Sequence, residues 1–192
     1  MQTRQQFETS AIVQQVLFSN NIFVFSSEKG KKGVTDTNAQ RLKNQVTKPE
    51  DIKIHKNYNI WTGKGGASDV DLDSKETREL ADIFLNPTGI EFGRSAHGGR
   101  SHRLYRVLDL DKKKHTRSAF TFRDSATDNT IIELRAHNHY TMCAGTYDDA
   151  DTAIFNKAEK PTEITYDQLH KQVAMLGLAS IILRKARISN PH

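Results

Sequence analysis

The chain has 192 residues, of which 36% are hydrophobic and 27% are charged, as is typical of one folded domain with a sizeable core and not of a disordered chain. It contains no apolar run near the roughly 20 residues of a membrane-spanning helix, and its N-terminus lacks a signal-peptide core. The single cysteine, Cys143, excludes an intramolecular disulfide and a cysteine-rich zinc site, and a net charge of +5 weakly favours a polyanionic partner. We therefore expect a cytoplasmic protein.

Helical and strand patterns alternate in the first half of the chain. Apolar residues near helical spacing predict a helix over 6–18, and a short apolar run predicts a buried strand over 22–25. A basic loop with Lys31 and Lys32 follows. Residues 57–63 then favour a strand that leads into a glycine-rich turn and an acidic strand over 67–73.

In the second half, Asp73 or Ser74 can cap a helix that Pro87 ends. A loop rich in glycine and arginine is expected over 89–100, followed by strands over 102–108 and 119–122. A second basic run contains Lys112, Lys113 and Lys114. Such runs are most often solvated loops, yet they could also hold phosphates.

The last two predicted features are a hairpin and a long helix. The hairpin arms are 131–135 and 140–144. Thr165 and Gln168 form a capping-box pair, and apolar residues then recur at 4-3-4-3 spacing. Because several strands occur in succession, the sequence predicts an α+β fold with a mainly antiparallel sheet.

Three aspartates alternate along the acidic strand. Side chains of a strand point to opposite faces in turn, so Asp69, Asp71 and Asp73 should share one face. Three neighbouring negative charges need neutralisation, and Mg²⁺ or Mn²⁺ prefers oxygen ligands. The alternative is a solvated acidic loop or a surface calcium site.

Donors suited to phosphate gather near a pair of glycines. Arg100, Ser101 and His102 follow Gly98-Gly99, and Arg94 adds another guanidinium. The alternative is a glycine hairpin with a surface histidine.

A further carboxylate, Glu133, shares a strand face with Arg135. Flanking aliphatic residues would desolvate Glu133, so it needs a partner: Arg135 in an ion pair, or a metal shared with the aspartates. Two other motifs, 137–139 (His-Asn-His) and 148–151 (Asp-Asp-Ala-Asp), are interpreted as surface because neither is completed by a known site pattern.

The order of these motifs resembles that of the archaeo-eukaryotic primase superfamily, in particular the bifunctional primase-polymerase (prim-pol) domains of plasmids and phages. Asp71-Leu72-Asp73 resembles the first motif of that family, an acid-x-acid pair. Glu133 resembles the carboxylate of the third motif, where the family more often has Asp. The second is similar to Arg100-Ser101-His102, where the family more often has Ser two positions before the His. The resemblance covers residues 10–147.

The resemblance implies an RRM-like catalytic core over 1–160, in two closely packed lobes. Residues 161–192 would form a C-terminal helix that packs on this core or leads to further domains. It also implies a plasmid- or phage-encoded or prokaryotic nucleotidyltransferase that makes or extends primers on single-stranded DNA from nucleoside triphosphates, with a helicase domain or protein as a further partner.

In such an enzyme Asp71, Asp73 and Glu133 would hold Mg²⁺ or Mn²⁺. Asp69 is the alternative to Asp73 as the metal-binding partner of Asp71. We favour Asp73, because Asp69 interrupts the apolar start of the strand. The remaining roles are nucleotide binding by Arg94, Arg100, Ser101 and His102, with His102 also counted as catalytic, and template binding by Lys31, Lys32, Lys112, Lys113 and Lys114. The alternatives are a catalytically inactive nucleic-acid-binding replication module and a metal-dependent nuclease.

Overall fold

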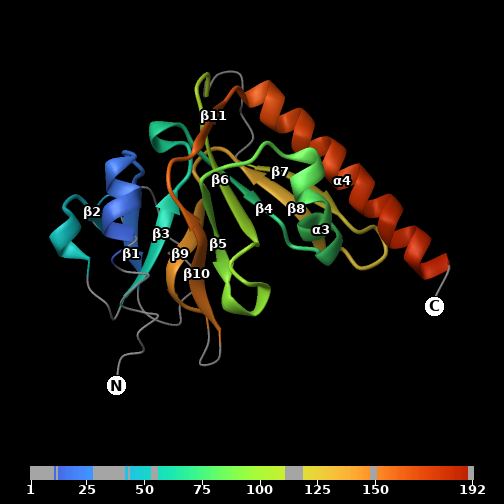
Figure 1. Ribbon diagram of the computed structural model, residues 1–192, viewed down its shortest axis with the longest axis horizontal. Coiled ribbons are helices and arrows are strands. Elements are labelled where there is room, and N and C mark those ends of the chain that lie inside the picture. Colours follow the sequence, from blue (N-terminus) through green and yellow to red (C-terminus); the bar gives the residue numbers. More distant parts are fainter. Residues whose placement is uncertain are drawn as a thin grey trace.

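The computed structural model describes residues 11, 13–27, 42, 44–52, 56–110, 119–147 and 151–189. It has the predicted α+β class with a large, mainly antiparallel sheet (Figure 1). The hydrogen-bonded order is β2-β1-β3-β9-β10-β5-β6-β4-β8-β7, and β11 pairs in parallel with β6. The strands are β1 (Val24–Ser27), β2 (Gln45–Val46), β3 (Asn57–Trp61), β4 (Ala67–Asp71), β5 (Ile90–Arg94), β6 (His102–Val107), β7 (Ala119–Arg123), β8 (Thr130–Arg135), β9 (Tyr140–Thr146), β10 (Thr152–Ala158) and β11 (Thr162–Ile164).

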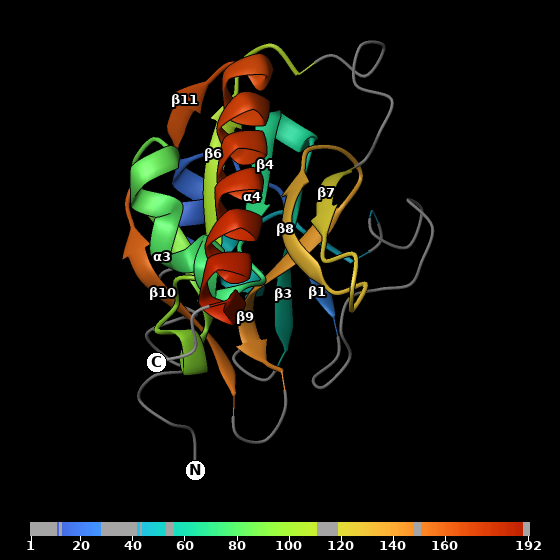
Figure 2. The same cartoon turned by 90° about the vertical axis from the view of Figure 1, so that its right-hand side faces the viewer.

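Two α-helices cover one face of the sheet. They are α3 (Lys75–Phe84) and α4 (Tyr166–Ser189), and α4 lies across the sheet beside α3 (Figure 2). The short helices of the described part are the π-helix η1 (Val13–Leu17) and the 3₁₀ turns η2 (Pro49–Asp51), η3 (Lys64–Gly66) and η4 (Ser95–His97). No helix of the described residues is both long and apolar enough to cross a membrane.

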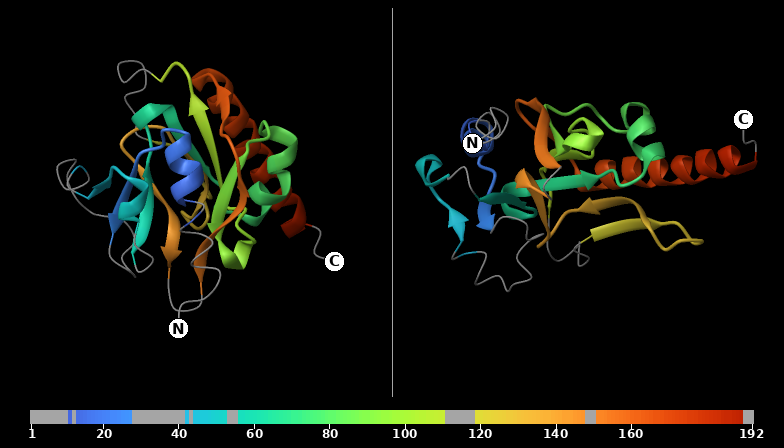
Figure 3. Two further views of the ribbon diagram at one scale, coloured as in Figure 1. Left: turned by 60° about the vertical axis from the view of Figure 1, so that its left-hand side comes forward. Right: turned by 90° about the horizontal axis from the view of Figure 1, so that it is seen from below.

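Two apolar clusters form the core. One lies under α3 and α4 and includes Val70 and Leu72 of the acidic segment together with Leu134. The other lies beside η1 and includes Leu17 and Ile60. Figure 3 shows η1 and α4 at opposite ends of the molecule. Because Val70 and Leu72 face the helices, the aspartates that alternate with them are directed to the other face of the sheet.

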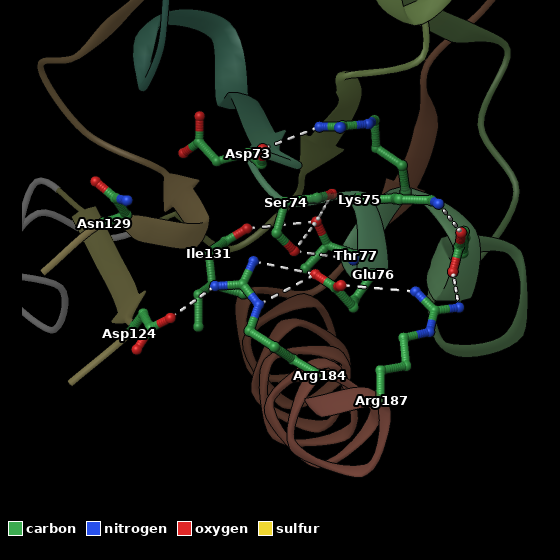
Figure 4. A network of polar contacts seen from close by, with 12 residues as sticks. Asp73, Ser74, Lys75, Glu76, Thr77, Asp124, Asn129, Ile131, Arg184 and Arg187 are labelled. Carbon is green, nitrogen blue, oxygen red and sulfur yellow. Dashed lines mark hydrogen bonds and ion pairs between the residues drawn. The ribbon is translucent and has the colours of Figure 1, made fainter. Parts of the chain in front are cut away.

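The ends of α3 and α4 are held by specific polar contacts. Ser74 caps α3 by accepting a hydrogen bond from the N–H of Thr77 at 3.1 Å. The predicted capping box is also present, since Gln168 Oε1 lies 3.0 Å from the hydroxyl of Thr165. Arg184 of α4 donates to Glu76 at the start of α3 (Figure 4). These contacts fix the segment that immediately follows the acidic strand.

Several predicted elements were wrong or displaced. The expected hairpin of 131–135 with 140–144 does not exist, because β8 pairs with β4 and β7 while β9 pairs with β3 and β10. The expected loop 89–100 contains β5, whose Ile90 and Phe92 are fully buried. The strand predicted over 22–25 runs from 24 to 27, and β10 and β11 were not predicted.

The C-terminal helix α4 packs on α3 and β8. The domain boundary at residue 160 and the two lobes stay predictions. Of the predicted first helix, 6–18, residues 6–10 and 12 lie outside the described part of the chain, and η1 occupies 13–17.

Candidate functional site

Five side chains form a row across the centre of the sheet. Asp71 of β4 lies opposite His102 of β6 and opposite Glu133 of β8. The row continues from His102 to Phe92 of β5 and from Glu133 to Thr121 of β7. Directly opposite residues of paired strands project to the same face. Strand pairing therefore brings together the acid of the first motif, the histidine of the second and the acid of the third.

Arg135 lies among the acidic side chains of this row. Its Nη2 is 2.6 Å from Oδ2 of Asp71, and its Nε is 2.6 Å from Oε2 of Glu133. Its Nη1 is 3.9 Å from Oδ2 of Asp69. Burial acts to lower the pKa of Arg135, but the carboxylates of Asp71, Asp69 and Glu133 raise it, so the guanidinium stays protonated.

His102 has a carboxylate on one side and an aromatic ring on another. Its Nδ1 is 3.0 Å from Oδ2 of Asp69 and 3.6 Å from Oδ1 of Asp71, and its ring stacks on Phe92 at 5.0 Å. Burial acts to lower the pKa of His102, but Asp71 and Asp69 raise it above its ordinary value. The imidazole is thus biased toward its cationic form.

The three aspartates differ in access to the cleft beside them. Asp69 is fully buried, Asp71 is 6% exposed, and Asp73 lies exposed beyond the end of β4. Burial raises the pKa of Asp71, opposed by His102 and Arg135. Partial desolvation and then the Asp71 charge raise the pKa of Asp73 to about 6. A bound cation would act against both shifts, because a nearby positive charge favours the ionised carboxyl.

A cleft of about 580 Å³ opens over this row. Its lining includes acids, arginines and histidines side by side. They are Asp71, Asp73, Arg78, Arg94, His97, His102, Glu133, Arg135 and His139. A ligand that matches such a surface has positive and negative parts of its own.

The predicted nucleotide-binding residues lie in different settings. Ser101 and His102 line the cleft, while Arg100 is exposed and is absent from the lining. Arg94 lines the cleft, but its Nη1 donates to Oδ2 of Asp151 at 3.1 Å and its guanidinium lies over the ring of Tyr147. Lys31, Lys32, Lys112, Lys113 and Lys114 fall outside the described residues.

Two residues that the sequence assigned to the surface are buried. Asp151 is 7% exposed and accepts hydrogen bonds from Ser95 and from the N–H of Ala96. His137 is 5% exposed. The prediction was wrong because an incomplete site pattern does not imply exposure, and the burial of Asp151 is compensated by the donors that it contacts.

Arg78 was missed in the sequence. It lies in the first turns of α3, and its Nη1 donates to the carbonyl oxygens of Leu72 and Asp73 at 2.8 and 3.0 Å. It therefore fixes the backbone on which Asp73 is carried. Its position four residues after the N-cap Ser74 was the available signal, because that spacing points a long side chain back toward the helix start.

As the side chains stand, no three His, Cys, Asp or Glu residues of the described part form a group that could hold a metal ion. The donor atoms nevertheless suit a hard divalent cation, since Asp71, Asp73 and Glu133 offer only oxygen and all line the cleft. In addition, Oδ1 of buried Asp69 has no hydrogen-bond partner among the described residues. The residues fit Mg²⁺ or Mn²⁺ provided that Arg135 moves from Asp71 and Glu133.

A scan of the chain against protein-family models finds no match. A search of curated proteins also finds no significant match.

Proposed function

We propose that this protein is a nucleotidyltransferase of the primase-polymerase type, which makes or extends primers on a single-stranded DNA template. The observation that carries the proposal is the arrangement of charge in the cleft. Three carboxylates from two chain segments line the cleft, Asp71 and Asp73 at the end of β4 and Glu133 on β8, together with several cationic side chains. A nucleoside triphosphate with divalent cations has the matching charges, because its metals are positive and its phosphates negative.

Asp71, Asp73 and Glu133 are the residues that would hold Mg²⁺ or Mn²⁺. When bound, such ions would neutralise the triphosphate and favour ionisation of the attacking hydroxyl. Asp69 would orient His102 from below, since its Oδ2 lies 3.0 Å from Nδ1 of that residue.

The cationic residues of the cleft would bind the triphosphate. His102, as imidazolium, and Arg94 would donate to phosphate oxygens, while Ser101 supports the segment that carries Arg94 by accepting its N–H at 3.3 Å. In the reaction the 3′-oxygen of the primer bonds to the α-phosphorus, the bond to the pyrophosphate breaks, and the hydroxyl proton leaves to solvent. Positioning and charge neutralisation supply most of the acceleration in such transfers.

The remaining parts of the proposal concern the rest of the chain. An RRM-like arrangement of the core, a template path along Lys31, Lys32 and Lys112–114, and a helicase domain or protein as partner all follow from the family resemblance. They belong to the proposal together with its plasmid, phage or prokaryotic setting.

The test is nucleotide incorporation by an Asp71→Asn variant. Wild-type protein with single-stranded DNA, labelled nucleotides and Mg²⁺ or Mn²⁺, with and without a primer, should yield extended strands. Asp71→Asn keeps the size of the side chain but removes a metal-binding charge, so we expect incorporation to fall by about 10³-fold or more. Asp128→Asn is the control, because Asp128 is exposed and pairs only with Arg123 in the described structure.

Three results would contradict the proposal. Unchanged synthesis by Asp71→Asn excludes this cleft as the active site. Products shorter than the substrate identify a metal-dependent nuclease instead. Binding of DNA without any incorporation by the wild type identifies an inactive replication module.

A further inference from the structure

The guanidinium of Arg135 lies between two of the carboxylates that are proposed to bind a divalent cation. It contacts Oδ2 of Asp71 and Oε2 of Glu133, each at 2.6 Å. We propose that Arg135 is a built-in counter-ion, which neutralises the metal-binding acids until metal and nucleotide arrive and then moves to the triphosphate. The inference rests on the proposed function, and it adds that metal and nucleotide bind cooperatively through this residue.

Arg135 and a metal compete for the same oxygen atoms. Oδ2 of Asp71 and Oε2 of Glu133 now accept the Nη2 and Nε hydrogens of Arg135, so these oxygens are not free for an ion held by both carboxylates. A cation at those oxygens would also lie against the positive guanidinium, and like charges at such distances repel strongly in a partly buried site. Arg135 must therefore leave before the metal can be bound by both acids.

Without metal, the acids need this arginine. Asp69, Asp71 and Glu133 are brought together by the pairing of β4 with β8, and Asp69 and Asp71 are buried. Carboxylates that lack a compensating charge in such a position are costly. Arg135 compensates all three, at 3.9 Å from Asp69 and at 2.6 Å from both Asp71 and Glu133. The fold can therefore form before any metal is bound.

Arg135 is also the arginine of the cleft that metal binding would release. Arg94 is held by Asp151 and Tyr147, and Arg78 is held by the carbonyl oxygens of Leu72 and Asp73. None of these partners is a side chain proposed to bind metal. The charged partners of Arg135, by contrast, include two that are.

The released side chain has a destination within reach. Arg135 lines the cleft and its side chain is 20% exposed, so it can turn toward a ligand there without disturbing the core. A guanidinium binds phosphate oxygens through two parallel hydrogen bonds. Metal binding requires Arg135 to move, and a bound nucleotide would stabilise the moved side chain. Each ligand therefore strengthens the binding of the other.

The test measures Mn²⁺ binding to the free protein by titration with electron paramagnetic resonance detection. Removing the competing charge in Arg135→Gln should tighten Mn²⁺ binding about tenfold or more. Arg135→Lys keeps a charge but cannot bridge two carboxylates. The Mn²⁺ affinity of this variant should therefore lie between those of the wild type and Arg135→Gln. Adding a nonhydrolysable nucleoside triphosphate should tighten Mn²⁺ binding in the wild type by a larger factor than in Arg135→Gln.

Thermal unfolding with and without Mn²⁺ supplies a second readout. Arg135→Gln should unfold at a lower temperature than the wild type in EDTA, and Mn²⁺ should restore most of the loss. Arg103→Gln is the matched control, because Arg103 is also a buried arginine and contacts the acids Asp82 and Glu91 outside the cleft. It should lose stability in a way that Mn²⁺ does not restore.

The outcomes separate this inference from the proposed function. If Arg135→Gln binds Mn²⁺ no more tightly than the wild type, or stays unfolded at saturating Mn²⁺, the counter-ion role is overturned even where the wild type extends primers. If the affinity rises as expected but the wild type incorporates no nucleotide, the counter-ion role holds and the polymerase assignment fails.

Discussion

Asp69, Asp71 and Asp73 differ in their burial and in the side chains that they contact. Asp69 lies beneath the cleft, with one oxygen against His102. Asp71 is close to both His102 and Arg135, and Asp73 projects from the chain after the strand has ended. Because metal ligation requires access to solvent-borne ions, Asp71 and Asp73 are the better candidates, and Asp69 is better placed to orient His102.

Asp151 is the residue that anchors Arg94, and its ionisation can be tested by pH. Burial acts to raise the pKa of Asp151, but hydrogen bonds from Ser95 and Ala96 and the Arg94 guanidinium lower it below its ordinary value. A carboxyl with a lowered pKa stabilises the fold above the pKa of the unfolded chain, and this contribution is lost as pH falls through the folded pKa.

We therefore expect Asp151→Asn to lower the unfolding temperature at pH 7. The difference from the wild type should shrink below about pH 4 and vanish below the folded pKa. Thermal unfolding followed by circular dichroism from acid to neutral pH measures it. A difference that stays constant over the whole range would mean that the charge of Asp151 contributes nothing. Asp128→Asn, at an exposed site, provides the reference.

At the scale of elements, α4 joins α3 to the hairpin of β7 and β8. Arg184 pairs with Glu76 at 3.0 Å and with Asp124 at 2.8 Å, as Figure 4 shows. Arg187 adds a contact with Glu79 at 2.7 Å. Since Glu76 follows Asp73 by three residues, these ion pairs hold the end of the acidic segment in place relative to the sheet.

Gly177 allows α4 to approach this hairpin closely. A Cβ at this position would lie 2.6 Å from Cδ2 of the Phe122 ring. Alanine at a helical glycine normally gains about 1 kcal/mol. Here we expect Gly177→Ala to lower the free energy of unfolding by about 1 kcal/mol instead, because overpacking costs more than the propensity gains.

Urea denaturation of four proteins tests the prediction: wild type, Gly177→Ala, Phe122→Ala and the double variant. Removing the ring should turn the effect of Gly177→Ala from destabilising to neutral or stabilising. A stabilising Gly177→Ala in the presence of Phe122 would show that the helix does not need this close contact.

At the scale of the whole molecule, the excess of basic residues is the feature that bears on the DNA partner. The net charge is +5, and the basic runs with Lys31, Lys32 and Lys112–114 lie outside the described residues. Their proposed contact with the template is electrostatic, so it should depend on salt through counterion release.

Changing Lys112, Lys113 and Lys114 together to Gln should weaken binding of single-stranded DNA of any sequence. The slope of log affinity against log salt should fall by about 2, or roughly 0.7 for each phosphate that is no longer neutralised. Fluorescence anisotropy at several salt concentrations measures both effects. The control changes Lys160, Lys171 and Lys185, which are exposed and do not line the cleft. Equal slopes for the two triple variants would reject a template path along 112–114.

Local pattern was sufficient where the determining interactions are local. The sequence predicted the acidic strand, the capped helix after it, the strand that begins at His102 and the capping box of α4. Strand alternation and helix capping depend on residues within a few positions of each other. The α+β class with a mainly antiparallel sheet followed from the number and order of such patterns.

Tertiary structure alone decided which strands are neighbours and which charges meet. The pairing of β8 with β4, and not with β9, sets Arg135 opposite Asp69 and Glu133 opposite Asp71. Burial of Asp151 is likewise set by donors more than 50 positions away in the chain. Pairing and burial are chosen by the free energy of the whole packed sheet, which short-range patterns do not encode. The sequence by itself thus determined which residues of this protein share a strand face, and the assembled sheet determined that an arginine neutralises its acids.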